Sequence, residues 1–362
     1  MRDGLRIGID ARAAAEVPAG RGRYVRELLR GLARSDAGAR FLLYAREPWP
    51  EPLDERFAWQ LVDSPDPLWH LRSARSASRD ANVILSTNSY LTAWFTRIPT
   101  AIVVHDMIAF HSDARPQRRA ALIEKATAGR AIRRAELLLP VSEWTRADLV
   151  RLFPRAAGKE RVVLEAAATP AGVSDPGEVV ARLGIERPFV LSVGTLEPRK
   201  NLGRLVEAWG RLPDELRAAH TLALVGPQGW ELDEVLAPVR ASGDDVRVTG
   251  FVGDDDLAAL YRACRAFAYP SLYEGFGLPV LEAMLQGAPV VCSDSSSLPE
   301  VGGDAVAYVD PRDTGSIVAA LERLLGDPDE RARLAAAGPV RAARFSWDET
   351  ARLTYEALAA LA

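Results

Sequence analysis

The sequence has few of the residues that build disulfide frameworks, zinc sites or membrane spans. It contains two cysteines and four histidines in 362 residues, with no CxxC motif. No disulfide framework or structural zinc site is indicated, and we predict that Cys264 and Cys292 are buried, reduced thiols. No window approaches the roughly 18 consecutive apolar residues of a membrane span. The start, Met1–Ile7, lacks the apolar core of a signal peptide, so we expect a cytoplasmic protein.

Lysine is also scarce. Of the 45 basic residues only Lys125, Lys159 and Lys200 are lysines, so a lysine within a motif carries more information than usual. The formal net charge is −4, which argues against nucleic acid as a main partner. The 48% hydrophobic and 26% charged residues fit a globular protein with sizeable cores.

Short apolar, β-branched runs alternate with longer helical patterns along the chain. This alternation predicts an α/β fold of two Rossmann-like, doubly wound domains with parallel sheets. The predicted strands of the first half are Leu5–Asp10, Phe41–Tyr44, Val83–Ser86, Ala101–His105, Leu137–Val141 and Arg161–Leu164. Those of the second half are Phe189–Val193, Thr221–Val225, Val246–Thr249, Ala266–Tyr269, Pro289–Cys292 and Ala305–Val309. The main predicted helices are Tyr24–Ala33, Pro116–Arg134, Asn201–Arg211, Asp254–Cys264, Pro279–Gln286 and Thr314–Leu325.

An Ala-, Pro- and Gly-rich stretch near 165–188 predicts the join between the two halves. The predicted domains are an N-terminal domain, 1–167, and a C-terminal domain, 168–346. Ser346 and Glu349 have the spacing of a capping box, which predicts a final helix over 347–362.

The loop after the predicted strand Phe189–Val193 has the features of an anion site. Gly194 permits a tight turn and close approach of a ligand. Arg199 and Lys200 stand at the start of a helix, whose free N–H groups also favour an anion. A solvated helix cap with incidental charge is the alternative, but the scarcity of lysine favours function.

The loop after Ala266–Tyr269 combines a glycine turn with two carboxylates. Gly275 and Gly277 bracket a turn whose amides can face a ligand, and a helix follows. Glu282 is one carboxylate in an otherwise apolar helical stretch and needs donors, which ribose hydroxyls would supply. Glu274 lies on the loop before it. The alternative is that Glu274 and Glu282 are ordinary surface acids, one on an exposed loop and one on a helix surface.

The stretch from Glu274 to Glu282 resembles the EX7E signature of the family-4 retaining glycosyltransferases of GT-B fold, in which two Rossmann-like domains face each other across a cleft. Four further stretches resemble that family in the same order, across the C-terminal half: Gly194–Leu202, Gly250–Val252, Ser296–Val301 and Asp304–Pro311.

The resemblance implies a role for each matched residue. Arg199 and Lys200 would bind the diphosphate of a nucleotide-sugar donor, Glu282 its ribose and Glu274 its sugar. Because a carboxylate beside a diphosphate would be repelled, we expect the acids at the sugar hydroxyls. The residues expected to bind the donor also include Gly194, Thr195, Phe251, Val252, Gly275, Phe276, Gly277 and Leu278, with Phe251 and Val252 beside the nucleobase.

No metal or cofactor is expected. There is no DxD motif in a strand-end setting. Asp254, Asp255 and Asp256 precede a helical pattern and are interpreted as an N-cap cluster with first-turn acids. The cations would stabilise the leaving diphosphate instead.

The first half offers two candidate contributions. The turn with Gly20 and Gly22 is not GxGxxG, so it does not indicate dinucleotide binding, and an ordinary loop is its alternative. It resembles the family's glycine loop, which faces the donor phosphates and the acceptor. His105 follows a predicted strand and resembles the histidine that contacts the donor sugar. The alternative is that His105 has only a structural role. Asp106 would either orient His105 or contact the acceptor.

Residues 115–155 contain ten basic and four acidic residues. They are either a solvated surface or a basic face for peripheral contact with a membrane. The acceptor cannot be identified from the sequence: a glycan, a lipid-linked sugar and a small molecule remain open.

We therefore expect a retaining, metal-independent hexosyltransferase with Glu274, His105, Arg199 and Lys200 as its catalytic residues. The motifs are similar to those of bacterial mannosyltransferases, which points to GDP-mannose as the donor, while UDP-sugars and other activated hexoses remain open. A sugar-nucleotide epimerase and a non-catalytic nucleotide-sugar-binding partner are the alternatives.

Overall fold

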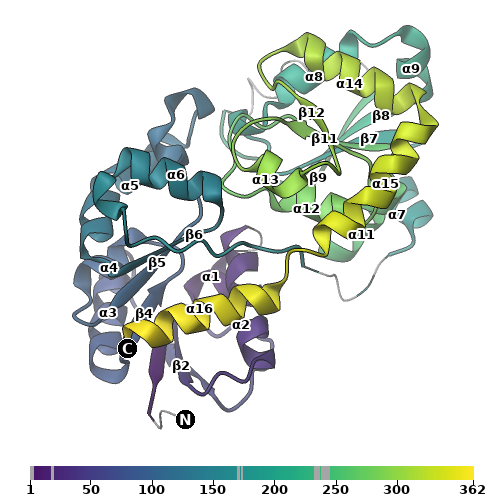
Figure 1. Cartoon of the computed structure of the whole chain (residues 1–362). Helices are drawn as coiled ribbons and strands as arrows, with labels where there is room; N and C mark the ends of the chain where they lie inside the picture. Colours follow the sequence, from purple (N-terminus) through teal and green to yellow (C-terminus); the bar gives the residue numbers. More distant parts are fainter. Residues whose placement is uncertain (1–3, 18–19, 169–171, 173, 232–236, 238–244) are drawn as a thin grey trace. The chain divides into compact units, whose positions relative to one another are not determined.

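The computed structural model describes residues 4–17, 20–168, 172, 174–231, 237 and 245–362. These residues form two compact units (Figure 1). Unit 1 comprises the described residues of Met1–Phe110, Arg118–Ala166 and Phe345–Ala362. Unit 2 comprises those of His111–Gln117 and Ala167–Arg344. Within the described residues, no helix is both long and apolar enough to cross a membrane.

Unit 1 is built on a parallel sheet that has, among the described residues, six strands in the order β3-β2-β1-β4-β5-β6. The strands are β1 (Arg6–Asp10), β2 (Arg40–Ala45), β3 (Phe57–Leu61), β4 (Val83–Ser86), β5 (Thr100–Val104) and β6 (Leu137–Pro140). The helices are α1 (Arg12–Glu16), α2 (Arg21–Arg34), α3 (Leu68–Asp80), α4 (Tyr90–Phe95), α5 (Arg118–Arg134), α6 (Glu143–Leu152) and α16 (Trp347–Leu361).

Unit 2 repeats this plan. Its described strands form a parallel six-stranded sheet in the order β12-β11-β10-β7-β8-β9. They are β7 (Phe189–Val193), β8 (Thr221–Val225), β9 (Val246–Gly250), β10 (Ala266–Tyr269), β11 (Val290–Ser293) and β12 (Ala307–Val309). The helices are α7 (Pro176–Arg182), α8 (Leu202–Gly210), α9 (Asp214–Ala219), α11 (Asp254–Ala263), α12 (Leu278–Leu285), α13 (Leu298–Gly302), α14 (Thr314–Gly326) and α15 (Pro328–Ala342).

The strand orders confirm the prediction of two doubly wound parallel sheets. In each sheet the order reverses at a central pair, β1 with β4 in unit 1 and β7 with β10 in unit 2. Loops diverge at the carboxyl ends of such a pair, and this is where ligands bind in open α/β sheets. Strands β4, β5, β8 and β10 are fully buried, which explains why continuous apolar runs predicted them.

The predicted strand Arg161–Leu164 is wrong. The N–H groups of Arg161 and Val163 donate to carbonyls of β6 at 2.9 and 3.0 Å, but this segment is not a strand. The ladder is limited to an isolated bridge between Leu138 and Glu160. Pro140 lacks the N–H that would return the next hydrogen bond, so regular pairing stops there. The partly exposed edge strand β3 was not predicted, because its pattern is not fully apolar.

Two cap predictions are corrected in part. Gly253, and not an aspartate, holds the N-cap position of α11, although all three acids lie in its first turn as expected. Ser346 caps α16 by accepting from the Glu349 N–H at 3.5 Å. The Glu349 carboxylate pairs with Arg352 at 2.6 and 2.7 Å. This ion pair takes the place of the hydrogen bond that a capping box would form between the Glu349 carboxylate and the Ser346 N–H.

The final helix α16 belongs to unit 1 and packs along α2 (Figure 1). Gly31 of α2 lies at the point of closest approach. A Cβ atom there would be 2.8 Å from both the Ala351 Cβ and the Trp347 carbonyl oxygen. Thr350 donates to the Leu164 carbonyl at 2.6 Å, which ties the start of α16 to the end of the segment Arg118–Ala166. The docking of α16 therefore depends on the absence of a side chain at 31.

Gly31→Ala should lower the free energy of unfolding of unit 1 by about 1–3 kcal/mol, because the new methyl group overpacks the contact with α16. Urea unfolding followed by hydrogen exchange of α16 measures the effect. Gly210→Ala is the matched control, since Gly210 ends a helix and its Cβ would meet nothing within 4 Å. Helix propensity alone favours alanine at both positions, so equal stabilisation of both variants would contradict the packing argument.

Candidate active site

The candidate active site of unit 2 lies at the point where its strand order reverses. The loop after β7 contains Gly194 and the 3-10 turn η4 (Pro198–Lys200), and the loop after β10 runs from Pro270 to Gly277. Since β7 and β10 are neighbouring parallel strands, both loops leave from the same edge of the sheet. The structure thereby brings Arg199, Lys200 and Glu274 together.

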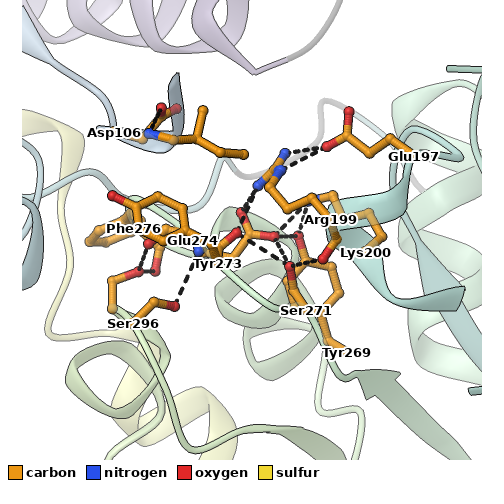
Figure 2. A network of polar contacts seen from close by, with 12 residues as sticks. Asp106, Glu197, Arg199, Lys200, Tyr269, Ser271, Tyr273, Glu274, Phe276 and Ser296 are labelled. Carbon is orange, nitrogen blue, oxygen red and sulfur yellow. Dashed lines mark hydrogen bonds and ion pairs between the residues drawn. The ribbon is translucent and has the colours of Figure 1, made fainter. Parts of the chain in front are cut away.

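The Glu274 carboxylate is the centre of this cluster (Figure 2). Its Oε2 accepts from Arg199 at 2.5 Å. Its Oε1 accepts from the Lys200 Nζ at 2.7 Å, the Tyr269 hydroxyl at 2.8 Å and the Ser271 hydroxyl at 2.6 Å. The Lys200 ammonium also donates to the Tyr269 hydroxyl. Glu274 and Lys200 are 6% and 8% exposed, so both charges are compensated inside the protein.

The environment keeps Glu274 ionised. Burial by itself raises the pKa of this carboxyl group, but the charges of Arg199 and Lys200 and the hydrogen bonds from Lys200 and Ser271 outweigh it. The pKa of Glu274 therefore falls from 4.5 to about 2. A carboxylate with this pKa is weakly basic at neutral pH.

Glu197 adds a second carboxylate to the cluster. It accepts from the Arg199 Nε at 2.8 Å and lies 2.6 Å from its Nη2. With two cations and two carboxylates, Arg199, Lys200, Glu197 and Glu274 have a formal net charge of zero. Each positive group therefore already has a carboxylate partner.

The local backbone is shaped to hold Lys200 in this position. Gly194 has φ +145°, and a Cβ atom there would lie 3.1 Å from the Lys200 Cε. Asn201 adopts the left-handed conformation with φ 60°. Its side-chain amide donates to the carbonyls of Pro270 at 3.0 Å and Pro311 at 2.7 Å. The turn that presents Lys200 is thus fixed from both ends.

A serine-rich loop fixes the glycine turn that follows Glu274. The Ser296 hydroxyl accepts from the Glu274 N–H at 3.1 Å. The Ser297 hydroxyl lies 3.1 Å from the Glu274 carbonyl and 2.6 Å from that of Phe276. Gly277 has φ +118°, and a Cβ atom there would be 2.7 Å from Leu298. The positions of the Glu274 and Gly275 backbone therefore depend on residues near 296.

Glu282 lies on α12, as predicted, and is 9% exposed. Its Oε2 accepts from the Tyr261 hydroxyl at 3.3 Å. The remaining predicted donor residues differ in exposure. Phe276 is buried, so only its backbone can meet a ligand, whereas Phe251 is 62% exposed at the end of β9. Thr195, Val252 and Leu278 are partly exposed, and Gly275 is buried.

His105 of unit 1 has protein partners at both ring nitrogens. Nε2 lies 2.9 Å from the Thr87 carbonyl and Nδ1 lies 3.1 Å from Glu165 Oε1. Because a carbonyl only accepts, Nε2 carries a proton. The Tyr24 ring packs edge-on at 4.9 Å between centroids. His105 is therefore held by three neighbours, and its contact with a donor sugar stays a prediction.

Backbone conformation and steric space explain the two glycines in the turn of unit 1. Gly20 has φ 54° at the N-cap position of α2. A Cβ atom on Gly22 would lie 1.8 Å from the Val17 carbonyl oxygen, so only glycine fits. Arg21 is exposed, and its guanidinium lies 3.5 Å from the Asn88 side-chain oxygen.

The basic stretch 115–155 is only partly a solvated surface. Arg130 lies over the Trp94 ring at 5.1 Å, and Arg134 donates to the Thr96 carbonyl at 2.6 Å. The apolar side chains of Leu122 and Ile123 on the same helix are 70% and 48% exposed. Contact of this face with a membrane stays a prediction.

Comparison with known proteins decides the family. Residues 18–164 match the family model "Glycosyltransferase Family 4", and residues 180–341 match "Glycosyl transferases group 1". O-antigen chain mannosyltransferase B of Escherichia coli is 36% identical over 310 residues, which cover 83% of this chain and 76% of that protein. The chain belongs to the family-4, group 1 glycosyltransferases.

A further curated protein is similar in sequence, and a solved structure is similar in fold. MMP alpha-(1->4)-mannosyltransferase of Mycolicibacterium hassiacum is 28% identical over 92% of this chain and 93% of its own length. The crystal structure of Anabaena HepE in complex with UDP-glucose matches the fold with a TM-score of 0.76, at 17% identity over 99% of this chain and all of that one. The glycosyltransferase activity and the GT-B fold that the motifs predicted are thus confirmed.

Several residues of the glycosyltransferase site were not predicted from the sequence. Glu197, Tyr269 and Ser271 contact the ion cluster, and Ser296 and Ser297 fix the backbone around Glu274. Three of them had a usable signal. Tyr269 is the last residue of a buried strand, Ser271 lies two residues after it, and Glu197 lies within the same loop as the two cations.

Tyr269→Phe should lower the free energy of unfolding by about 1–2 kcal/mol, because it removes a buried hydroxyl that donates to Glu274 and accepts from Lys200. Urea unfolding measures the difference. Tyr355→Phe, which removes a hydroxyl from a partly exposed tyrosine of α16, is the control and should change stability by less than about 0.5 kcal/mol. Equal losses at the two positions would contradict the role given to Tyr269.

Proposed function

We propose that this glycosyltransferase moves a mannosyl group from GDP-mannose to an acceptor hydroxyl, with retention at the anomeric carbon and without a metal ion. Both curated relatives described above are named as mannosyltransferases, which supports mannose as the sugar. A structural neighbour binds UDP-glucose, which supports a nucleotide-sugar donor. The observation that carries the proposal is the buried cluster of Arg199, Lys200 and Glu274 where the sheet order reverses.

Arg199 and Lys200 are proposed to bind the donor diphosphate. They precede α8, whose N-terminal N–H groups add a partial positive charge. When the glycosidic bond breaks, charge grows on the leaving diphosphate, and cations at this place stabilise it most in the transition state. The neutral cluster has to redistribute its contacts on binding, since both cations hold Glu274 beforehand.

The other donor contacts are proposed on the same basis. Glu282 would accept from ribose hydroxyls, and Phe251 with Val252 would border the base. The backbone at Gly194, Thr195 and 275–278 would approach the phosphates and the sugar. In unit 1, Gly20, Gly22 and His105 are proposed to complete the donor site, as the resemblance implies.

Retention is proposed to proceed without a covalent intermediate. A double displacement needs a nucleophilic carboxylate beside the anomeric carbon. Glu274 is poorly suited to that role, because its pKa is about 2 and both oxygens accept hydrogen bonds from charged groups. The acceptor would then attack on the face from which the diphosphate leaves, and the leaving phosphate oxygen would take the acceptor proton. Glu274 would stabilise positive charge on the sugar and hold the two cations.

The proposal of a metal-free reaction rests on the charges in place. Arg199 and Lys200 supply the positive charge that a metal would otherwise bring to the diphosphate. The acidic run at the start of α11 has protein partners. Asp255 accepts from the Gly172 N–H at 3.2 Å, and Asp256 accepts from the Ser174 hydroxyl at 2.6 Å.

Incubation with GDP-mannose and a panel of sugar acceptors should release GDP only when an acceptor is present, and the new linkage should be α. GDP release and the anomeric signals of the product in NMR measure both points. Excess chelator should leave the rate unchanged. Turnover of only a different nucleotide sugar would refute the donor, a β linkage would refute retention, and a loss restored by Mg²⁺ would refute the metal-free claim.

Lys200→Met should weaken GDP binding by on the order of tenfold or more, because it removes a charge-assisted contact with the diphosphate. Titration calorimetry with GDP measures the change. Lys125→Met, at an exposed position of α5, removes the same charge elsewhere and should leave the affinity unchanged. An unaltered GDP affinity in Lys200→Met would exclude the proposed role.

A further inference from the structure

Unit 1 contains a cavity of about 230 Å³ at the carboxyl ends of two central strands. Asn88 and Tyr90 follow β4, Asp106 follows β5, and Ile123 and Glu124 of α5 form the opposite wall. Ligand pockets for drug-sized molecules usually have about 300–1,000 Å³. A smaller cavity at a strand edge suits one sugar ring better than a longer chain.

The charges around this cavity are mainly negative. Asp106 and Glu124 are acidic, and Arg21 is the cation among the described lining residues, so the formal charge is −1 when both acids are ionised. Both nitrogens of His105, which also lines the cavity, already bond to Thr87 and Glu165. An incoming phosphate would therefore meet two carboxylates against one guanidinium.

The Glu124 carboxylate is half-buried, and no hydrogen bond or ion pair from the described residues engages it. Burial and the nearby Asp106 charge raise its pKa to about 7, while Arg21 opposes the shift. Asp106 is held in place because its Oδ1 accepts from the Ile108 N–H at 3.0 Å. A half-buried carboxyl group in this state gains from ligands that donate hydrogen bonds, such as sugar hydroxyls.

The other walls suit the apolar face of a sugar. The Tyr90 hydroxyl is directed to the Met107 sulfur at 4.0 Å, so the phenol is fixed within unit 1. Ile123 adds an aliphatic surface that is 48% exposed. An apolar lining with a few convergent polar groups is typical of small-molecule sites.

We propose that this cavity binds a non-anionic sugar residue of the acceptor, that Glu124 and Asp106 accept hydrogen bonds from its hydroxyls, and that the cavity discriminates against phosphorylated acceptors. This inference rests on the proposed function, because it names the acceptor class of the same enzyme. Glu124 is the residue that sets the specificity, since its ionisation decides whether the cavity is neutral or negative.

Saturation-transfer NMR with methyl glycosides of common hexoses and with the matching hexose 6-phosphates tests the proposal. At least one neutral glycoside should bind the full-length protein, and each 6-phosphate should bind more weakly than its neutral counterpart. Glu124→Gln should lower the affinity for the neutral glycoside on the order of tenfold. Glu55→Gln, at an exposed carboxylate of the same unit, is the matched control and should leave the affinity unchanged.

Glu124→Lys changes the formal charge of the cavity from −1 to +1 and should bring a measurable gain in affinity for the 6-phosphate. Failure of all neutral glycosides to bind, tighter binding of a 6-phosphate to the unaltered protein, or equal losses in Glu124→Gln and Glu55→Gln would overturn the proposal. Calorimetry with GDP on the same samples reports on the donor site separately. Intact GDP binding with no sugar binding would refute the cavity and leave the donor proposal standing.

Discussion

The ionised carboxylate of Glu274 is the constraint on which the candidate site of unit 2 depends. An isolated buried charge is strongly unfavourable, so its position requires Arg199, Lys200 and hydroxyl donors at the same time. These partners come from loops after two different strands, β7 and β10. The compensation is possible only because those strands are neighbours in the sheet. Loss of any one partner leaves a charged group short of a partner.

This dependence explains features that have no direct contact with a ligand. Gly194 leaves room for the Lys200 side chain, and the left-handed Asn201 anchors the turn on which Lys200 stands. Ser296 and Ser297 hold the backbone at Glu274 from the other side. The glycosyltransferase motifs therefore contain positioning residues as well as residues for the donor. A motif that consists only of two glutamates eight positions apart does not include these positioning residues.

Much of the fold could be predicted, because fully buried parallel strands are continuous apolar runs. The limits of Val83–Ser86, Phe189–Val193, Thr221–Val225 and Ala266–Tyr269 agree with the structure. The segment Arg161–Leu164 has the same composition, yet Pro140 on its neighbour cannot continue the ladder. Such a failure depends on a partner strand that local sequence does not identify. Helix α15 was not predicted either, and here the obstacle is local, because Pro339 interrupts the helical pattern.

The main charged residues of the candidate site could be predicted from the sequence, but the ion pairs between them could not. The motifs identified Arg199, Lys200, Glu274 and Glu282, but the ion pairs of Glu274 with the two cations were not predicted. Burial accounts for these pairs, because cations inside the protein need counter-charges and Glu274 supplies one. In the proposed reaction, a donor diphosphate would compete with Glu274 for the same cations. Its binding would free part of the hydrogen-bonding capacity of the carboxylate for the sugar. The ion pairs that keep Glu274 ionised would then couple the arrival of the diphosphate to the stabilisation of positive charge at the anomeric carbon.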